Sequence, residues 1–300
     1  MLAEIFYWLL SMSITATVTG LCVLLIRAIR KVPRSLICVL WAIPFIRMWL
    51  PIGFGSPYSL LTLLISFHSR SVEIPGLDYT AMNHVAAADS YFPISFKTNQ
   101  LANIFTIAST VWLIVAALLL IVLTVLYFAE KRSIRSAVLD HQNVWFSECV
   151  KYPTVYGLVS PKIVLPSSCM EQDQTFVLMH EKMHIRRKDN FWRLLGIVTA
   201  VIHWYNPFTW LYLKCFLMDL EFACDEGVLR QCGEEQRKAY ASALLDSAQS
   251  GLTFVSCFGG GKLRKRVERI LTYRKLSLFS AVCAVIFALF VACTLLTNPI

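Results

Sequence analysis

Residues 191–217, FWRLLGIVTAVIHWYNPFTWLYLKCFL, decide the topology of this chain. The stretch is apolar and longer than the roughly 20 residues with which a helix crosses a bilayer. Asn206 and Pro207 interrupt it near the middle, and the residue before a proline is pushed out of helical geometry. One alternative is a single membrane span, which places the flanking residues on opposite faces. The other is a pair of shorter helices, buried or re-entrant, which returns the chain to the same face.

The composition predicts an integral membrane protein. The 300-residue chain is 57% hydrophobic and 16% charged, whereas a soluble domain carries about 25% charged residues. Its mean hydropathy is +0.59. Four further apolar stretches are long enough to predict transmembrane helices, at about residues 5–26, 36–53, 103–128 and 276–298. No basic residue precedes the first, so we expect an uncleaved anchor rather than a signal peptide.

The second predicted span carries Pro44 and Arg47. An arginine within a membrane usually faces protein or a polar cavity, whereas one near a helix end extends to the interface. The sequence leaves both positions open for Arg47.

Lysine and arginine in the connecting segments set the orientation. Lysine and arginine are concentrated in residues 27–34, 131–135 and 262–275, whereas residues 54–102 contain only two basic residues. We therefore expect residues 129–275 on the cytoplasmic face and residues 54–102 outside. This distribution also explains most of the net charge of +9, and it favours contact with membrane lipid over direct nucleic-acid binding. None of the ten cysteines lies in residues 54–102 and no CxxC pair occurs, so neither a disulfide framework nor a cysteine zinc site is predicted.

The expected fold class is an α-helical membrane protein with an α+β domain on the cytoplasmic face. Its expected parts are two transmembrane helices (1–53), an extracytoplasmic loop (54–102), a third transmembrane helix (103–128), the cytoplasmic domain (129–275) with a membrane-embedded hairpin (191–217), and a fourth transmembrane helix (276–300). Within the domain, residues 153–168 predict a pair of short strands and residues 174–187 predict a helix.

The helix at 174–187 carries the pattern HEKMH. His180 and His184 stand four residues apart and so project from one helix face. Neutral imidazoles in this arrangement can hold zinc at about 2.0–2.1 Å. Glu181 is rotated by about 100° from His180, which places its carboxylate beside the open position of the metal as a general base. The pattern therefore predicts a hydrolytic zinc site.

A third ligand is available in residues 218–229, MDLEFACDEGVL. Glu221 and Asp225 are again four residues apart, which assigns zinc ligation to Glu221. Asp225 then accepts the second ring N–H of a liganding histidine. Glu226 competes with Glu221 as ligand but has no acidic partner four residues on. Glu221 can meet His180 only if both lie on one side of the membrane, so the site predicts the hairpin for residues 191–217.

Four other polar residues have simpler interpretations. Asp189 and Asn190 fit N-caps of the following helix better than catalytic groups. His203 lies alone on an apolar stretch and is interpreted as structural. Tyr240 either stabilises an oxyanion or is a packed aromatic, and packing is the simpler reading.

HEKMH, HWYNPFTW and EFACDE, arranged between these spans, resemble the BlaR/MecR-type antirepressor metallopeptidases. The resemblance extends over about residues 1–298, and the NP-containing apolar segment between the ligands is its most specific mark. It implies a gluzincin-like zinc metalloprotease domain in a bacterial plasma-membrane protein. The positions that match the family's motifs imply that His180, His184 and Glu221 are zinc ligands and that Glu181 is the general base. They also imply that Asp225 holds a liganding side chain in place.

The resemblance also implies a substrate. Members of the family cut themselves before the last span, and their signalling leads to removal of a transcriptional repressor. The region at 254–266, FVSCFGGGKLRKR, is the candidate self-cleavage region, although no cleavage-site pattern matches it residue by residue. The antibiotic-sensing members carry a penicillin-binding domain after the last span, and this chain stops at residue 300 without a serine acylation motif. We therefore expect no β-lactam sensing, unless the sequence is a fragment of a longer protein.

The expected function is a membrane-bound zinc endopeptidase in signal transduction, which acts on itself, on a repressor, or on both. The sequence is compatible with a homodimer and with a monomer. The alternative is a non-proteolytic transducer with a structural zinc site, which tolerates the loss of Glu181. A small transporter is a third interpretation, which the single charged residue inside the predicted spans disfavours.

Overall fold

The computed structural model describes residues 1–29, 32–50, 99–141, 143–150, 152–170, 174–249, 260–273 and 278–296. The chain divides into two compact units. Unit 1 comprises Met1–Leu119, Thr199–Leu213 and Ser277–Ile300, and unit 2 comprises Leu120–Val198 and Lys214–Leu276. Helices α5 (Asn99–Ile134), α7 (Asp189–Ile202) and α8 (Pro207–Gln231) contribute residues to both units. The predicted extracytoplasmic loop lies almost wholly outside the described residues.

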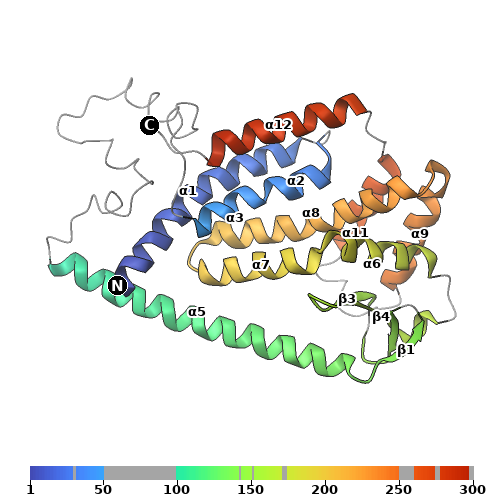
Figure 1. Ribbon diagram of the computed structural model, residues 1–300, viewed down its shortest axis with the longest axis horizontal. Helices are drawn as coiled ribbons and strands as arrows, with labels where there is room; N and C mark the ends of the chain where they lie inside the picture. Colours follow the sequence, from blue (N-terminus) through green and yellow to red (C-terminus); the bar gives the residue numbers. More distant parts are fainter. Residues whose placement is uncertain are drawn as a thin grey trace. The chain divides into compact units, whose positions relative to one another are not determined.

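Unit 1 is a helical assembly. Helix α1 (Leu2–Ala28) packs against α3 (Ala42–Trp49), and α12 (Leu278–Leu296) packs against α2 (Arg34–Leu40) and α3 (Figure 1). Among the described residues, two helical segments are long and apolar enough to cross a bilayer, Leu2–Ala28 and Asn103–Arg132. They coincide with the first and third predicted spans. Val285–Thr294, within the fourth predicted span, is a shorter apolar helical stretch.

The second predicted span is not one helix in the structure. It is divided at Trp41 into α2 and α3. Pro44 explains the break, because it has no N–H to donate to the carbonyl of Leu40 and its ring crowds that carbonyl. Arg47 is 4% exposed, so its side chain lies inside the protein rather than reaching an interface.

The apolar segment 191–217 is also divided, at the dipeptide that the sequence indicated. Helix α7 ends at Ile202, and α8 begins at Pro207, a residue suited to the first helical position. The Asn206 side chain accepts a hydrogen bond from the backbone N–H of Phe208 at 2.9 Å, as an N-cap does. Its amide nitrogen donates to the hydroxyl of Ser13 at 2.7 Å, which ties the turn to α1 within unit 1.

Unit 2 contains a four-stranded sheet. The strands are β1 (Val138–His141), β2 (Val144–Ser147), β3 (Thr154–Tyr156) and β4 (Lys162–Pro166), in the order β1-β2-β4-β3. Strands β2 and β4 are parallel, whereas β1–β2 and β3–β4 are antiparallel. The predicted strand pair at 153–168 is therefore confirmed as β3 and β4, and β1 and β2 were not predicted. Strand β3 is an edge strand.

Helix α6 (Thr175–Arg187) confirms the helix predicted at 174–187, and it lies between the sheet and three other helices of unit 2 (Figure 1). Those helices are α8, α9 (Arg237–Gln249) and α11 (Gly260–Thr272), with short 3-10 turns at Ser167–Cys169 and Glu234–Gln236. One face of α6 packs on the sheet through Val177, Leu178 and Ile185. On the opposite face, Met183 packs closely against Gly227 of α8, where a Cβ would lie 2.8 Å from the Met183 sulfur. This close packing brings α6 and α8 together where the predicted ligands lie.

Candidate metal centre

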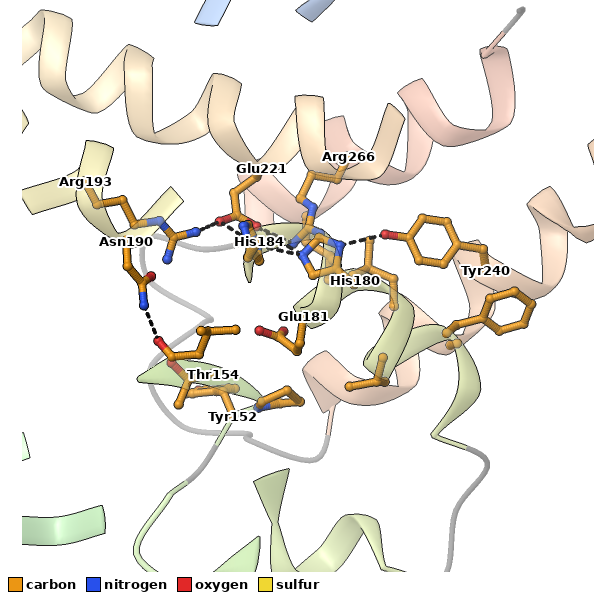
Figure 2. A pocket seen from close by; sticks show the side chains of 17 residues that line it. Tyr152, Thr154, His180, Glu181, His184, Asn190, Arg193, Glu221, Tyr240 and Arg266 are labelled. Atoms are coloured by element: carbon orange, nitrogen blue, oxygen red, sulfur yellow. Dashed lines mark hydrogen bonds and ion pairs between the residues drawn. The ribbon is translucent and has the colours of Figure 1, made fainter. Parts of the chain in front are cut away.

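His180 and His184 face one point in the interior of unit 2. They are one helical turn apart on α6, and their Nε2 atoms are 3.1 Å from each other. Their residues are 7% and 6% exposed. Figure 2 shows both rings turned toward α8. The i and i+4 spacing therefore has the geometric consequence that the sequence predicted.

Glu221 of α8 lies opposite the two rings. One carboxylate oxygen is 3.6 Å from His180 Nε2 and the other is 3.8 Å from His184 Nε2. Ligand atoms around a tetrahedral zinc ion are separated by about 3.3 Å when the metal–ligand distances are about 2.0–2.1 Å. The three donors are therefore spaced nearly as zinc ligands are, and the Arg266 guanidinium, which contacts His180 Nε2 and Glu221, must move aside for an ion to bind. Glu226, the competing candidate, is paired with Arg269 at 3.8 Å and does not line this pocket.

The second nitrogen of each ring also has a carboxylate nearby. His184 Nδ1 is 2.6 Å from Asp189 Oδ2. His180 Nδ1 is 2.9 Å from the Tyr240 hydroxyl and 3.3 Å from Asp225 Oδ1. Such partners fix the tautomer and the orientation of a liganding imidazole. Asp225 thus lies where the sequence placed it, beside a histidine.

The position of Asp189 results from the chain turn after α6. Lys188 has φ 56°, in the left-handed region, and caps the helix end. This turn returns Asp189 to His184, where Arg187 Nε also donates to its other oxygen at 3.2 Å. The interpretation of Asp189 as a cap was incomplete, because the residue both begins α7 and contacts His184. Its spacing of five residues from His184 was the signal available in the sequence.

Tyr240 lines the pocket, and its hydroxyl contacts polar groups of the site. Its hydroxyl donates to Asp225 Oδ1 at 2.6 Å, on the side of the His180 ring away from Glu221 (Figure 2). The residue is 1% exposed and belongs to the core of unit 2. In this geometry it holds Asp225 and His180 together.

Two arginines that sequence reasoning did not select complete the charge balance. Arg266 of α11 donates to both oxygens of Asp225, at 2.8 and 2.9 Å, and its Nη1 is 3.3 Å from Glu221. Its Nη2 is also 3.2 Å from His180 Nε2. Arg193 of α7 donates to the other oxygen of Glu221. No spacing rule links these arginines to HEKMH, so the fold alone reveals them.

These contacts keep the two carboxylates ionised. Burial by itself raises the pKa of Glu221, but a hydrogen bond with His180 and the surrounding positive charges hold it well below its usual range. Burial likewise raises the pKa of Asp225, but the adjacent Arg266 outweighs burial and lowers the pKa to about 2. Both groups therefore carry negative charge into a buried site.

Neighbouring groups also shift the pKa values of the two imidazoles. Burial lowers the pKa of His184, but Asp189 and Cys224 outweigh it and raise the pKa to about 9. Burial also lowers the pKa of His180, and Cys224, Tyr240 and Asp225 together raise it well above its usual range. Both imidazoles therefore bind a proton more readily than an exposed histidine does.

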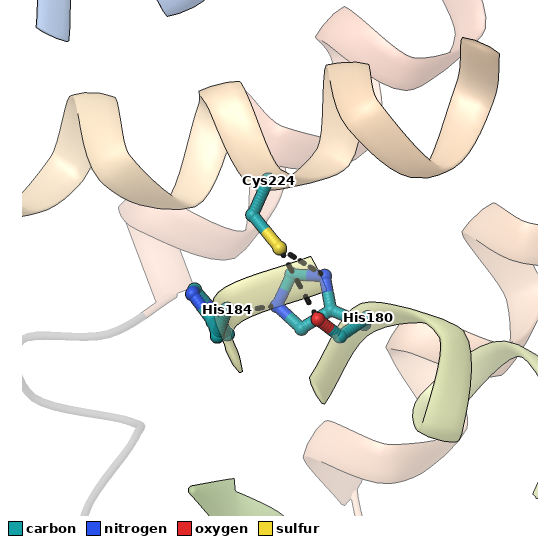
Figure 3. Close-up of side chains that lie close together, drawn as sticks. All are labelled: His180, His184 and Cys224. Atoms are coloured by element: carbon teal, nitrogen blue, oxygen red, sulfur yellow. Dashed lines mark hydrogen bonds between the residues drawn. The ribbon is translucent and has the colours of Figure 1, made fainter. Parts of the chain in front are cut away.

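Cys224 is a further donor beside the histidines. Its sulfur is 3.5 Å from His180 Nδ1 and 3.3 Å from the His180 carbonyl oxygen (Figure 3). His180, His184 and Cys224 have ligand atoms within 4.8 Å of one another, so this cluster is compatible with a metal ion. The sulfur faces the Nδ1 side of His180, whereas Glu221 faces the Nε2 atoms of both rings.

Glu181 lies beside this cluster in a pocket of about 240 Å³. Its residue is 7% exposed, and its carboxylate lies between the histidines and Thr154 of β3 (Figure 2). Edge strand β3 forms the opposite wall, and the Asn190 amide donates to the carbonyl of Val155 at 2.7 Å. The pocket therefore places a carboxylate, a candidate metal site and a half-buried edge strand together. His203 lies in unit 1, outside this site, with Nδ1 3.1 Å from the Thr199 carbonyl oxygen.

Comparison with known proteins identifies relatives of this chain. Residues 7–270 match the family model described as BlaR1 peptidase M56. The regulatory protein BlaR1 of Bacillus licheniformis is 26% identical over 172 residues, which cover 53% of this chain and 29% of that protein. The methicillin resistance mecR1 protein of Staphylococcus aureus (strain Mu50 / ATCC 700699) is 28% identical over 109 residues, or 35% of this chain and 19% of that protein. The chain thus aligns with less than a third of the length of each relative.

Proposed function

Because the chain belongs to the BlaR1 peptidase M56 family, we propose that it is a membrane-bound zinc endopeptidase of bacterial signal transduction. The convergence of His180, His184 and Glu221 beside Glu181 carries this proposal. The substrate proposed is a protein: this chain itself, a transcriptional repressor, or both. The names of the relatives, regulatory protein BlaR1 and methicillin resistance mecR1 protein, support a regulatory role.

The proposed topology has four membrane spans, with the zinc domain on the cytoplasmic face. Helices α1 and α5 support the first and third spans, and α12 with its shorter apolar stretch supports the fourth. The turn at Asn206 supports the hairpin, since it lets α7 and α8 both place their polar ends in unit 2. The boundaries of the five parts remain those proposed from the sequence.

In the proposed mechanism, His180, His184 and Glu221 would hold a zinc ion. Zinc in such a site lowers the pKa of water to about 7 and polarises a carbonyl group. Glu181 accepts a proton from the attacking water and delivers it to the leaving amine, because its carboxylate shares the pocket with the ligands. Asp189 and Asp225 hold the two imidazoles in the ligating tautomer. An extended peptide can pair with edge strand β3, which lines the same pocket.

A zinc chelator provides the direct test of this function. Full-length protein with a tag at each end is incubated in bacterial membranes, and its processing is followed by immunoblotting, with labelled casein as a second substrate. We expect 1,10-phenanthroline to stop cleavage and added zinc to restore it, because the ligand set requires the metal. Cleavage that persists unchanged under chelation contradicts a zinc peptidase.

Replacement of Asp189 by asparagine tests the support of His184. Asparagine is also a good N-cap, so α7 should keep its start while the charge beside His184 Nδ1 is lost. We expect zinc affinity to fall by about 10–100-fold, measured by competition with a chromophoric chelator. Exchange of Asn190 for serine, which leaves the His184 contact intact, is the control. Equal zinc affinities for the Asp189 variant and the unaltered protein rule out this role.

Cys224 favours one alternative function, a transducer with a structural zinc site. Structural zinc sites are closed by four protein ligands, and a buried thiol beside His180 is a fourth donor. In that alternative, Glu181 has no chemical task. The two functions therefore differ in what the loss of Glu181 does.

A further inference from the structure

A second pocket in unit 2 lies where α5 meets the β3–β4 hairpin. It has a volume of about 750 Å³. Its lining combines the end of α5 with the hairpin, and contains Phe128, Lys131, Arg132, Ile134, Arg135, Tyr156, Gly157, Ser160 and Lys162. Four of these residues are cations and none is a carboxylate. The pocket therefore has the chemistry of an anion site, separate from the candidate metal centre.

The four cations are available to a ligand. Lys131 and Arg132 are exposed on α5 and Arg135 is exposed in the turn after it, and within the described parts of the chain none of the three has an ion-pair partner. Lys162 comes from β4, and its ammonium group lies 4.0 Å above the ring of Trp145. This contact fixes Lys162 on one side of the pocket while its charge remains unneutralised.

Tyr156 adds a polar atom to the same wall. Its ring stacks on Tyr127 of α5 with centroids 5.8 Å apart, which joins the hairpin to the helix. Its hydroxyl is buried without a hydrogen bond of good geometry, and its polar neighbours on α5 are the Tyr127 hydroxyl and the Glu130 carboxylate. The hydroxyl can still donate to an acceptor that enters the pocket. A phosphate oxygen accepts from tyrosine, lysine and arginine alike.

The position of the pocket along α5 suggests where the phosphate comes from. The apolar segment of α5 that can cross a bilayer is Asn103–Arg132, so the pocket lies at its end. Tyr127 and Phe128 are 43% and 58% exposed there, as aromatic residues at a membrane interface are. The tip of the hairpin exposes Leu158, and Val159 at 95%, beside the cationic pocket. Apolar residues at the tip with cations behind them match the acyl and headgroup layers of a membrane.

We propose that this pocket binds the phosphate headgroup of an anionic phospholipid and that the β3–β4 hairpin dips its tip into the same leaflet. The site anchors the sheet, and with it edge strand β3 of the metal pocket, at a defined height above the membrane. The proposal rests on α5 being a membrane span and not on proteolytic activity. Lipid binding and peptidase activity can therefore be disproved independently of each other.

The test measures lipid-dependent stability of the full-length protein. The protein is purified in an uncharged detergent, and its Tm is recorded during titration with phosphatidylglycerol, with phosphatidylcholine, or with soluble glycerol 3-phosphate. We expect a saturable rise of Tm with phosphatidylglycerol that sodium chloride weakens, and little change with the other two. An equal rise with glycerol 3-phosphate overturns the lipid assignment, and an equal rise with phosphatidylcholine overturns the anion site.

A triple variant locates the effect. Lys131→Gln, Arg135→Gln and Lys162→Gln together should weaken the response to phosphatidylglycerol by about 100-fold. The matched control removes three exposed cations elsewhere in unit 2, by Arg186→Gln, Lys238→Gln and Lys265→Gln. Equal loss in both variants means a general charge effect and overturns the proposal.

A single exposed substitution covers the case in which the triple variant does not fold. Val159→Asp is at an exposed tip, so it should leave the fold intact. It places a negative charge in the acyl layer that the tip is proposed to enter, and should weaken the response to phosphatidylglycerol by about tenfold. An unchanged response contradicts the placement of the hairpin tip in the membrane.

Discussion

Replacement of Glu181 by glutamine is expected to reduce proteolysis by about 10²–10⁴-fold, the usual contribution of a general base. Glutamine keeps the shape of the side chain but cannot accept a proton. Glu181 is not one of the proposed ligands, since Glu221 faces the two Nε2 atoms instead. The variant should therefore bind as much zinc as the unaltered protein. Processing is measured by immunoblotting of bacterial membranes, and zinc by elemental analysis of the purified protein.

The neighbouring residue supplies a matched control. Lys182 is exposed on the same helix and is not one of the three proposed ligands, so Lys182→Gln should preserve both cleavage and zinc content. Cleavage that continues equally in the Glu181 and Lys182 variants shows that Glu181 is not the base. The transducer with a structural zinc site then becomes the better explanation. Loss of zinc together with activity in the Glu181 variant would instead point to a structural fault.

The sequence predicted the parts of this site that follow from short-range spacing. His180 and His184 share a helix face because they are four residues apart, and the helix around them is confirmed. Asn206 and Pro207 disrupt helical geometry locally, and the break between α7 and α8 lies there. Such features depend on residues within one or two turns, so they can be recognised without knowledge of the fold.

Features that depend on distant packing escaped prediction. Strands β1 and β2 were missed because they are four residues long and lie beside polar segments without a clear alternation. Arg266 is 86 residues from His180, and only the packing of α11 on α8 brings it to Asp225. The division of the second span at Trp41 was missed because hydropathy does not register the missing hydrogen bond of Pro44. In each case the deciding contact or bond is not visible in local composition.

The identity of the third ligand leads to the other large expected effect. Glu221→Ala removes the carboxylate opposite both Nε2 atoms, so zinc content should fall from about one ion per chain to almost none, and proteolysis should be lost with it. Glu226→Ala is the matched control, because Glu226 lies on the same helix but pairs with Arg269. It should retain both zinc and activity.

The Glu221 variant also separates the two possible donor sets. Without Glu221, Arg193 and Arg266 lose a carboxylate partner, so their positive charges further oppose a bound cation. Retention of zinc despite this repulsion requires another strong donor, and the buried thiol of Cys224 is the candidate. The zinc content of the Cys224→Ser variant then distinguishes the two ligand sets. If this variant retains zinc while the Glu221 variant does not, the metal is held by two histidines and a glutamate, an arrangement that keeps one position open for water.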